Sequence, residues 1–244
     1  MSLVPVQPSP RILVADDDLV SRLAMEEVLR QCGDPGIVLV DDGAAAWQAM
    51  TGPAFFDLIC LDVRMPPPDG LELVARLRAA PALRRVPTML ITSTADRSTV
   101  LSATRADLQG FIVKPVGAET VLRIERVLAQ LDATVLEPAA GAVARLRVDT
   151  ARHSRYVAAF AQQVETLAGL ARELASPAAG AAVRAAFLHK ADACRTAALT
   201  LGATRLEQLV SDAIALLGAD PPGAARALGQ ADYWLARVIA ARRV

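Results

Sequence analysis

Five short apolar runs, separated by longer amphipathic segments, are the feature that most constrains how residues 11–131 can fold. The runs are RILVA, GIVLV, FDLICL, TMLIT and GFIV, and helical patterns such as SRLAMEEVLRQ and GLELVARLRAA lie between them. Strands that alternate with helices along a chain form a parallel sheet with helices on its faces. The pattern therefore predicts an α/β doubly wound five-stranded parallel sheet, an architecture that binds ligands outside the carboxyl ends of its strands.

Beyond Leu131 the strand patterns end, and the remaining sequence is helical in period. We interpret the Ala-, Pro- and Gly-rich stretch DATVLEPAAGA as a linker that leads into a short helix near 140–150. Turn signals at Ser176-Pro177, Gly202 and Asp220-Pro221 divide the rest into long helical segments near 152–175, 177–201, 203–217 and 221–243. Four such segments in succession predict an all-α four-helix bundle.

We therefore expect an N-terminal tail at 1–8, an α/β domain at 9–132, a linker at 133–143 and a helical bundle at 144–244. The 26 basic and 26 acidic residues balance over the whole chain, but residues 1–133 hold 13 basic and 17 acidic residues, whereas the remainder holds 13 and 9. The two parts thus differ in net charge, −4 against +4. Neither value resembles the basic footprint of a nucleic-acid-binding domain, so we expect no nucleic-acid partner.

The cysteine content and the apolar segments indicate the compartment. Cys32, Cys60 and Cys194 are odd in number and widely spaced, which argues against a disulfide framework and for a reducing environment. The N-terminus has prolines where a signal peptide needs its apolar core, and no stretch has the length of a membrane span. We therefore expect a cytoplasmic protein without a membrane partner, and we interpret Cys60 as a packing residue.

Chemically active side chains follow the predicted strands at their carboxyl ends. Asp16 and Asp17 come after RILVA, Asp62 follows FDLICL, Thr92 ends TMLIT, and Lys114 follows GFIV. Gathered carboxylates are hard oxygen ligands of the kind that Mg²⁺ prefers. With a hydroxyl and a lysine they predict a phosphoryl-transfer site, in which Asp62 is the nucleophile, Lys114 and the metal neutralise phosphoryl oxygens, and Thr92 hydrogen-bonds one of them.

These motifs make residues 9–132 resemble the receiver domain of two-component response regulators. Intervals of 45, 30 and 22 residues separate Asp17, Asp62, Thr92 and Lys114, and they suit that family. The resemblance implies a flavodoxin-like fold and a phosphoryl group on Asp62 that comes from the phosphohistidine of a sensor histidine kinase or an HPt protein. It implies a domain that catalyses its own Mg²⁺-dependent phosphorylation and dephosphorylation rather than a conventional enzyme.

The resemblance also implies roles for residues near these motifs. The main-chain carbonyl of Arg64 would join Asp16, Asp17 and Asp62 on the metal, and Phe111 would act with Thr92 as the conformational switch. Ser93 stands where the family usually has alanine or glycine, and Pro67-Pro68 stiffen the loop after Asp62.

The second half resembles a degenerate histidine phosphotransfer (HPt) domain over about residues 144–244. If Gly202 is aligned with the second glycine of that motif, Asp192 falls where the acceptor histidine belongs, and Arg195 and Thr196 fall where lysine and the first glycine belong. The core stripe on this helix is predicted to consist of Phe187, Ala191, Cys194, Ala198 and Leu201. Asp192, Thr196 and His189 then point outward, as a docking face requires.

Three interpretations of this helix remain open. Asp192 marks a pseudo-HPt face that binds receivers without phosphoryl chemistry, or His189 is a displaced phosphohistidine that passes phosphate onward, or both are solvated residues on a dimerisation or spacer bundle. Asp192 lies three residues after His189 and would repel phosphate there. We expect His153, at the start of a helix, to be a surface residue.

Together these patterns predict a cytoplasmic bacterial response regulator, phosphorylated on Asp62, with a pseudo-HPt bundle as a docking or regulatory module. The alternatives are a phosphorelay phosphotransferase that uses His189 and an interaction scaffold that is never phosphorylated. A second receiver domain is the partner expected on the bundle, and a homodimer remains open.

Overall fold

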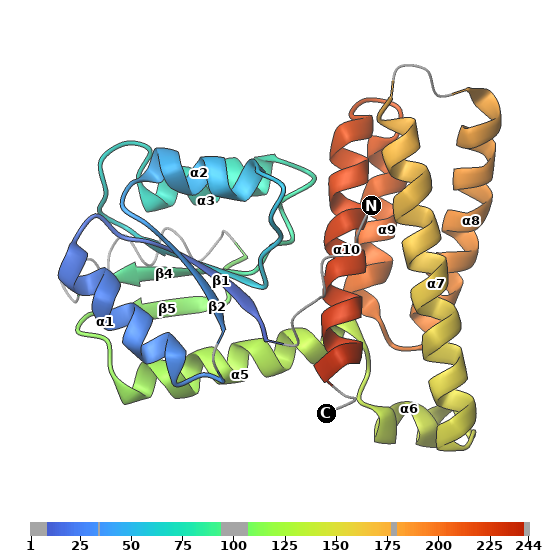
Figure 1. The fold of residues 1–244 in the computed structure, drawn as a ribbon, viewed down its shortest axis with the longest axis horizontal. Helices are drawn as coiled ribbons and strands as arrows, with labels where there is room; N and C mark the ends of the chain where they lie inside the picture. The colour runs from blue at the N-terminus through green and yellow to red at the C-terminus, as the bar shows by residue number, and fades with distance from the viewer. Residues whose placement is uncertain (1–8, 34, 94–106, 177–179, 242–244) are drawn as a thin grey trace. The chain divides into compact units, whose positions relative to one another are not determined.

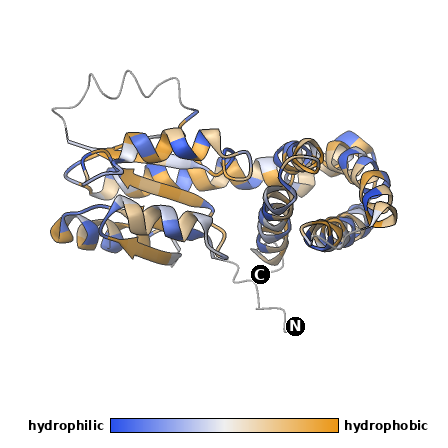
Figure 2. Cartoon of the chain, turned by 90° about the horizontal axis from the view of Figure 1, so that it is seen from above, coloured by the Kyte–Doolittle hydropathy of each residue, from blue (hydrophilic) through white to orange (hydrophobic). Residues whose placement is uncertain are grey.

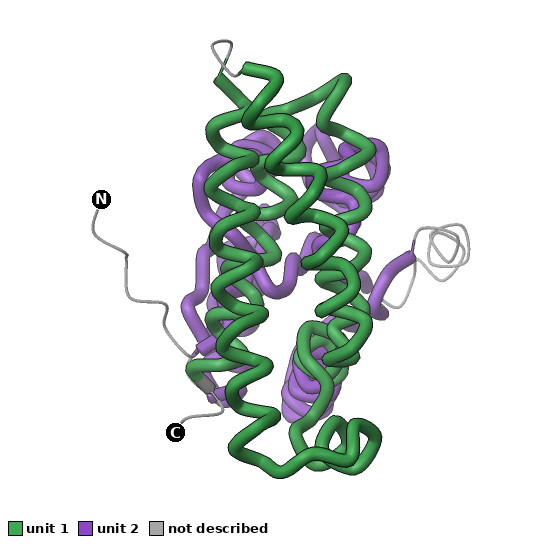
Figure 3. Tube along the Cα trace, turned by 90° about the vertical axis from the view of Figure 1, so that its right-hand side faces the viewer, with its two compact units in different colours: residues 1–8, 130–244 green, residues 9–129 purple. Residues whose placement is uncertain are grey.

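The computed structural model describes residues 9–33, 35–93, 107–176 and 180–241. The chain divides into two compact units, of which one contains residues 9–129 and the other contains the chain from Gln130 onward (Figure 3). The first unit is an α/β sandwich and the second is helical (Figure 1).

The first unit is built on one five-stranded sheet with the strand order β2-β1-β3-β4-β5. All neighbouring strands pair in parallel. The strands are β1 (Arg11–Ala15), β2 (Gly36–Val40), β3 (Leu58–Asp62), β4 (Thr88–Thr92) and β5 (Gly110–Val113). The five-stranded parallel sheet predicted from the apolar runs is confirmed. Strands β3 and β4 are buried along their whole length, which explains why they are apolar without alternation.

Helices cover both faces of this sheet, with α2 and α3 on one side and α1 and α5 on the other (Figure 1). They are α1 (Leu19–Arg30), α2 (Gly43–Thr51), α3 (Gly70–Ala79) and α5 (Ala118–Val135). Aspartates begin three of them, because the Asp18, Asp42 and Asp69 carboxylates accept hydrogen bonds from the main-chain N–H groups three residues later. The strands are largely apolar, whereas the helices mix apolar and polar residues (Figure 2).

The second unit contains a four-helix bundle that is preceded by a short helix. The helices are α6 (Ala139–Leu146), α7 (Thr150–Leu174), α8 (Ala181–Thr200), α9 (Thr204–Leu216) and α10 (Pro221–Ala241). Each of the last four packs against two others in a closed ring, α7 with α8 and α10, and α9 with the same two. Phe160, Phe187 and Trp234 are the largest side chains of the core. The helical bundle predicted for the second half is confirmed.

One expectation about the bundle was wrong, and one lies partly outside the described residues. Helix α8 is described from Ala181, after the N-cap residue Gly180, whereas Pro177 of the predicted Ser176-Pro177 start is not among the described residues. His153 is buried, with 3% of its surface exposed, because it precedes Phe160 by seven residues on the core side of α7. The predicted start of α10 is correct, since the Asp220 carboxylate accepts a 3.0 Å hydrogen bond from the N–H of Gly223.

The stretch interpreted as a linker, 133–143, is largely helical, because α5 ends at Val135 and α6 begins at Ala139. Within the described residues, Ala118–Leu146 is the one segment that is long and apolar enough to be a membrane-span candidate by length and composition. Two of its carboxylates form ion pairs within the helical unit, Asp132 with Arg237 of α10 and Glu137 with Arg145.

Candidate functional site

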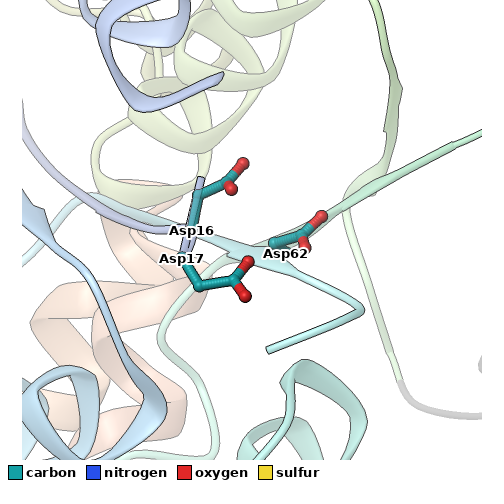
Figure 4. A group of neighbouring side chains, drawn as sticks. All are labelled: Asp16, Asp17 and Asp62. Carbon is teal, nitrogen blue, oxygen red and sulfur yellow. The ribbon is translucent and has the colours of Figure 1, made fainter. Parts of the chain in front are cut away.

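Three carboxylates meet at the carboxyl edge of the sheet. Asp16 and Asp17 follow β1, and Asp62 is the last residue of the neighbouring strand β3. One oxygen from each carboxylate lies within 4.8 Å of the others, and Figure 4 shows the three side chains beside one another. Asp16 and Asp62 are buried, with 1% and 5% of their surface exposed, whereas Asp17 is open to solvent. The parallel topology brings them together because β1 and β3 end side by side.

Lys114, which follows β5, reaches two of these carboxylates. Its Nζ lies 2.8 Å from Asp16 Oδ2 and 3.0 Å from Asp62 Oδ1. Burial acts to lower the pKa of Lys114, but its ion pairs with the two carboxylates outweigh burial and raise this pKa. Burial raises the pKa of Asp62 and the Asp16 charge adds to the rise, although Lys114 opposes it. The ammonium therefore stays charged, and it compensates only part of the negative charge.

The donor set fits a hard divalent cation. Asp16 Oδ2 is fully buried and accepts no hydrogen bond of good geometry from the described residues, so only the charge of Lys114 holds it. Three carboxylates face one ammonium, which leaves negative charge that a divalent cation would neutralise. Carboxylates, a main-chain carbonyl and waters are the ligands that Mg²⁺ accepts in proteins.

The other predicted residues of the receiver site lie around this cluster. The N–H of Arg64 donates a 3.2 Å hydrogen bond to Asp62 Oδ2, which holds the loop after β3 against the carboxylate. Thr92 is buried at the end of β4, and its hydroxyl donates to the carbonyl of Ser93 at 3.2 Å. Phe111, on β5, is half-buried against the core on the α2–α3 side. The metal role of the Arg64 carbonyl stays a prediction.

Sequence reasoning missed two residues that hold this site. A Cβ at Gly70, the first residue of α3, would lie 2.2 Å from the carbonyl oxygen of Asp62, so α3 can approach the end of β3 only with glycine there. Arg22, on α1, donates a 2.6 Å hydrogen bond from Nη1 to the carbonyl of Asp16. The Asp-Gly pair at the start of a helix was a signal for Gly70. No sequence pattern points to Arg22, because its partner is a main-chain atom.

On the bundle, some residues of the predicted docking face are exposed, whereas Arg195 is engaged within the bundle. Asp192, Thr196 and His189 are exposed on α8, and the predicted core stripe of this helix is buried. Arg195 instead turns to α9, where its Nε lies 3.2 Å from Glu207 Oε1. The Thr196 hydroxyl donates to the Asp192 carbonyl at 3.1 Å. The Arg195 guanidinium, which falls where the HPt motif has its lysine, is therefore engaged in an ion pair.

Gly202, which anchored the comparison with HPt domains, ends α8 in a left-handed conformation with φ of +63°. The N–H of Ala203 returns to the carbonyl of Ala198 at 2.8 Å, as in a Schellman motif. Glu137 packs against this turn, and a Cβ at Gly202 would lie 2.6 Å from its Oε2. Helix termination and packing are sufficient reasons for a glycine here.

The cysteines take no part in either site. Cys32, Cys60 and Cys194 are buried thiols, and burial raises the pKa of Cys60 and of Cys194 to about 12. Thiols with such pKa values stay protonated at neutral pH, so they act as packing residues.

Comparison with known proteins identifies the family of the first unit. Residues 12–125 match the model of the response regulator receiver domain. The chemotaxis protein CheY-3 of Vibrio cholerae is 31% identical over 122 residues, which are 50% of this chain and 93% of that protein. The chemotaxis protein CheY of Pseudomonas aeruginosa is 29% identical over 123 residues, 50% of this chain and 98% of that protein. A solved signal receiver domain of a signal transduction histidine kinase from Syntrophus aciditrophicus is 27% identical, covers 50% of this chain and 92% of that chain, and has a TM-score of 0.45.

Proposed function

The chain belongs, through residues 12–125, to the response regulator receiver family, and on this basis we propose that it is a two-component response regulator that takes phosphate on Asp62. The observation that carries the proposal is the buried Asp62 carboxylate at the end of β3, which lies beside Asp16 and Asp17 and pairs with Lys114. An Asp62 oxygen attacks the phosphorus of a phosphohistidine, the P–N bond breaks, and the imidazole leaves with the bonding pair.

The side chains around Asp62 have distinct tasks in this step. Asp16, Asp17, Asp62 and the Arg64 carbonyl would hold Mg²⁺, which supplies positive charge for the transferring phosphoryl oxygens. Lys114, already 3.0 Å from Asp62 Oδ1, neutralises an oxygen of the acyl phosphate. The hydroxyl of Thr92 exchanges its bond with the Ser93 carbonyl for one with the phosphoryl group, and Phe111 responds as the switch residue.

An exposed apolar face of α1 supports docking of a phosphodonor beside Asp62. Leu19, Val20 and Leu23 are 58%, 73% and 53% exposed. Next to them lies a cavity of about 390 Å³ that Val20 lines together with Asp16 and Lys114. Large exposed apolar side chains at a site rim are typical of an interaction surface. A sensor histidine kinase or an HPt protein is the donor that we propose for this face.

The bundle is proposed to act as a pseudo-HPt docking module for a receiver domain. Leu188 and Leu199 are 44% and 59% exposed on α8, and Asp192 lies between them at spacings of four and seven residues, which puts all three on one side of the helix. The bundle half carries +4 and the receiver half −4, so the charges favour such docking. Among the described residues, no group of candidate metal ligands includes Asp192, so we propose it as a docking residue rather than an acceptor.

A relay through His189 is the second candidate, favoured by the exposure of that imidazole on α8. Against it stand Asp192, three residues on, and the engagement of Arg195 by Glu207. A scaffold that is never phosphorylated is the third. We propose a cytoplasmic location for each, and homodimerisation stays open.

The test is phosphorylation of the full chain by a cognate kinase or by acetyl phosphate, with the stability of the product measured in acid and base. Wild type should carry one base-labile acyl phosphate that Asp62→Asn lacks. Acid-labile label that persists in Asp62→Asn and disappears in His189→Ala would support the relay instead. Absence of label from every donor would support the scaffold.

A further inference from the structure

Arg22 is the side chain that ties α1 to the main chain of the acidic site. It lies in the first turn of α1, and its Nη1 donates a 2.6 Å hydrogen bond to the carbonyl oxygen of Asp16. Side chains on a helix lean toward its N-terminus, so the guanidinium reaches back over the loop that joins β1 to α1. The contact is partly buried, which favours its persistence in solution.

This bond completes the anchoring of Asp16. The N–H of Asp16 donates to β2, its Oδ1 accepts from the N–H of Asp18 at 3.0 Å, and its Oδ2 lies 2.8 Å from Lys114. Arg22 satisfies the remaining carbonyl without occupying a carboxylate oxygen. The peptide group between Asp16 and Asp17 is planar, so a fixed Asp16 carbonyl also fixes the positions of the Asp17 nitrogen and Cα. The bond therefore constrains the main chain from which two of the three carboxylates project.

Two effects of Arg22 on a bound cation have opposite signs. Its positive charge beside the carboxylates repels Mg²⁺, whereas its hydrogen bond holds the carboxylates in one geometry and reduces the cost of ordering them. We propose that the second effect dominates and that Arg22 is a positioning residue of the cation site. This inference rests on the proposed function, because it assumes that Asp16, Asp17 and Asp62 bind Mg²⁺.

The affinity for Mg²⁺ tests the proposal without reference to phosphorylation. The chain has two tryptophans, Trp47 in the receiver and Trp234 in the bundle, so Trp47 fluorescence in a Trp234→Phe background reports urea unfolding of the receiver alone. The rise of the urea midpoint with Mg²⁺ concentration yields an apparent Kd. Arg22→Met removes the charge and the donor, and Arg22→Lys keeps the charge. Arg30→Met is the matched control, because Arg30 lies on the same helix but pairs with Glu26.

We expect Arg22→Met to bind Mg²⁺ about tenfold more weakly than wild type, at the low end of what removal of an outer support costs a metal site, because the lost charge offsets part of the effect. Arg22→Lys should lose less affinity for Mg²⁺ than Arg22→Met. If Arg22→Met fails to fold, the Mg²⁺ affinity of Arg22→Lys tests the same positioning role. Arg30→Met should bind like wild type. Unchanged or tighter binding by Arg22→Met would overturn the positioning role. A wild type that shows no response to Mg²⁺ would refute the metal site itself, and this inference with it.

Discussion

Removal of the Lys114 ammonium should destabilise the metal-free receiver. At an effective dielectric constant of about 20, two carboxylates whose oxygens lie within 4.8 Å of one another repel by roughly 3.5 kcal/mol or more, and each contact of Lys114 opposes this repulsion. Removing one partner of a buried ion pair costs about 3–5 kcal/mol. Because the Lys114 side chain is 25% exposed, we expect Lys114→Met to lose about 2–3 kcal/mol, that is, a urea midpoint lower by roughly 1–2 M.

The measurement is urea unfolding followed by Trp47 fluorescence in the Trp234→Phe background, without metal and with Mg²⁺. Lys190→Met is the matched control, because Lys190 is the other lysine of the chain and lies exposed on α8. Mg²⁺ should reduce the loss of unfolding free energy in Lys114→Met. The cation neutralises the carboxylate charge that the ammonium neutralised, and it binds the freed carboxylates more tightly.

The pH dependence has a definite sign. The pKa of Asp62 is already raised in the folded protein, and loss of Lys114 raises it further. A carboxyl group whose folded pKa exceeds its unfolded pKa destabilises the fold above that range, and the penalty disappears as pH falls and the group is protonated. The deficit of Lys114→Met should therefore be largest near neutral pH and shrink in acid. Equal urea midpoints for Lys114→Met and Lys190→Met at pH 7 would refute the reasoning.

Three further predictions follow from the same contacts. Asp17→Asn should fold normally, since Asp17 is exposed, but it should lose the Mg²⁺-dependent rise in urea midpoint and phosphorylation with it; labelling equal to wild type would remove Asp17 from the metal site. Gly70→Ala should cost about 2–3 kcal/mol and slow phosphorylation, because its Cβ would overlap the Asp62 carbonyl, whereas Gly117→Ala, with nothing within 4 Å of its Cβ, should do neither. The full-length Asp62→Asn chain, mixed with a phosphorylated receiver, should gain no acid-labile label; label that His189→Ala removes would contradict the pseudo-HPt assignment.

The fold of the first unit was predictable because its strands are apolar enough to be recognised one by one. Parallel pairing puts the carboxyl ends of the strands at one edge, and the strand order β2-β1-β3-β4-β5 makes β1 and β3 neighbours, so the meeting of Asp16, Asp17 and Asp62 follows from topology. The supporting contacts were not predictable in this way. Arg22 bonds a main-chain oxygen, so no sequence pattern points to it, and the Asp-Gly pair marks the start of α3 without showing that a side chain at Gly70 would overlap the Asp62 carbonyl.

In the bundle, the resemblance to HPt domains was aligned on one residue, Gly202, and one glycine is weak evidence for a family. A glycine after a helix is required wherever the chain turns in a left-handed conformation, so Gly202 is expected in many helical hairpins and discriminates poorly among them. Residues that the fold does not require are better evidence for a function. Leu188 and Leu199 expose apolar surface at a cost in solvation, and Asp192 lies between them without a partner in the core. The case for a docking role therefore rests on this exposed face of α8 rather than on the glycine by which the resemblance was first aligned.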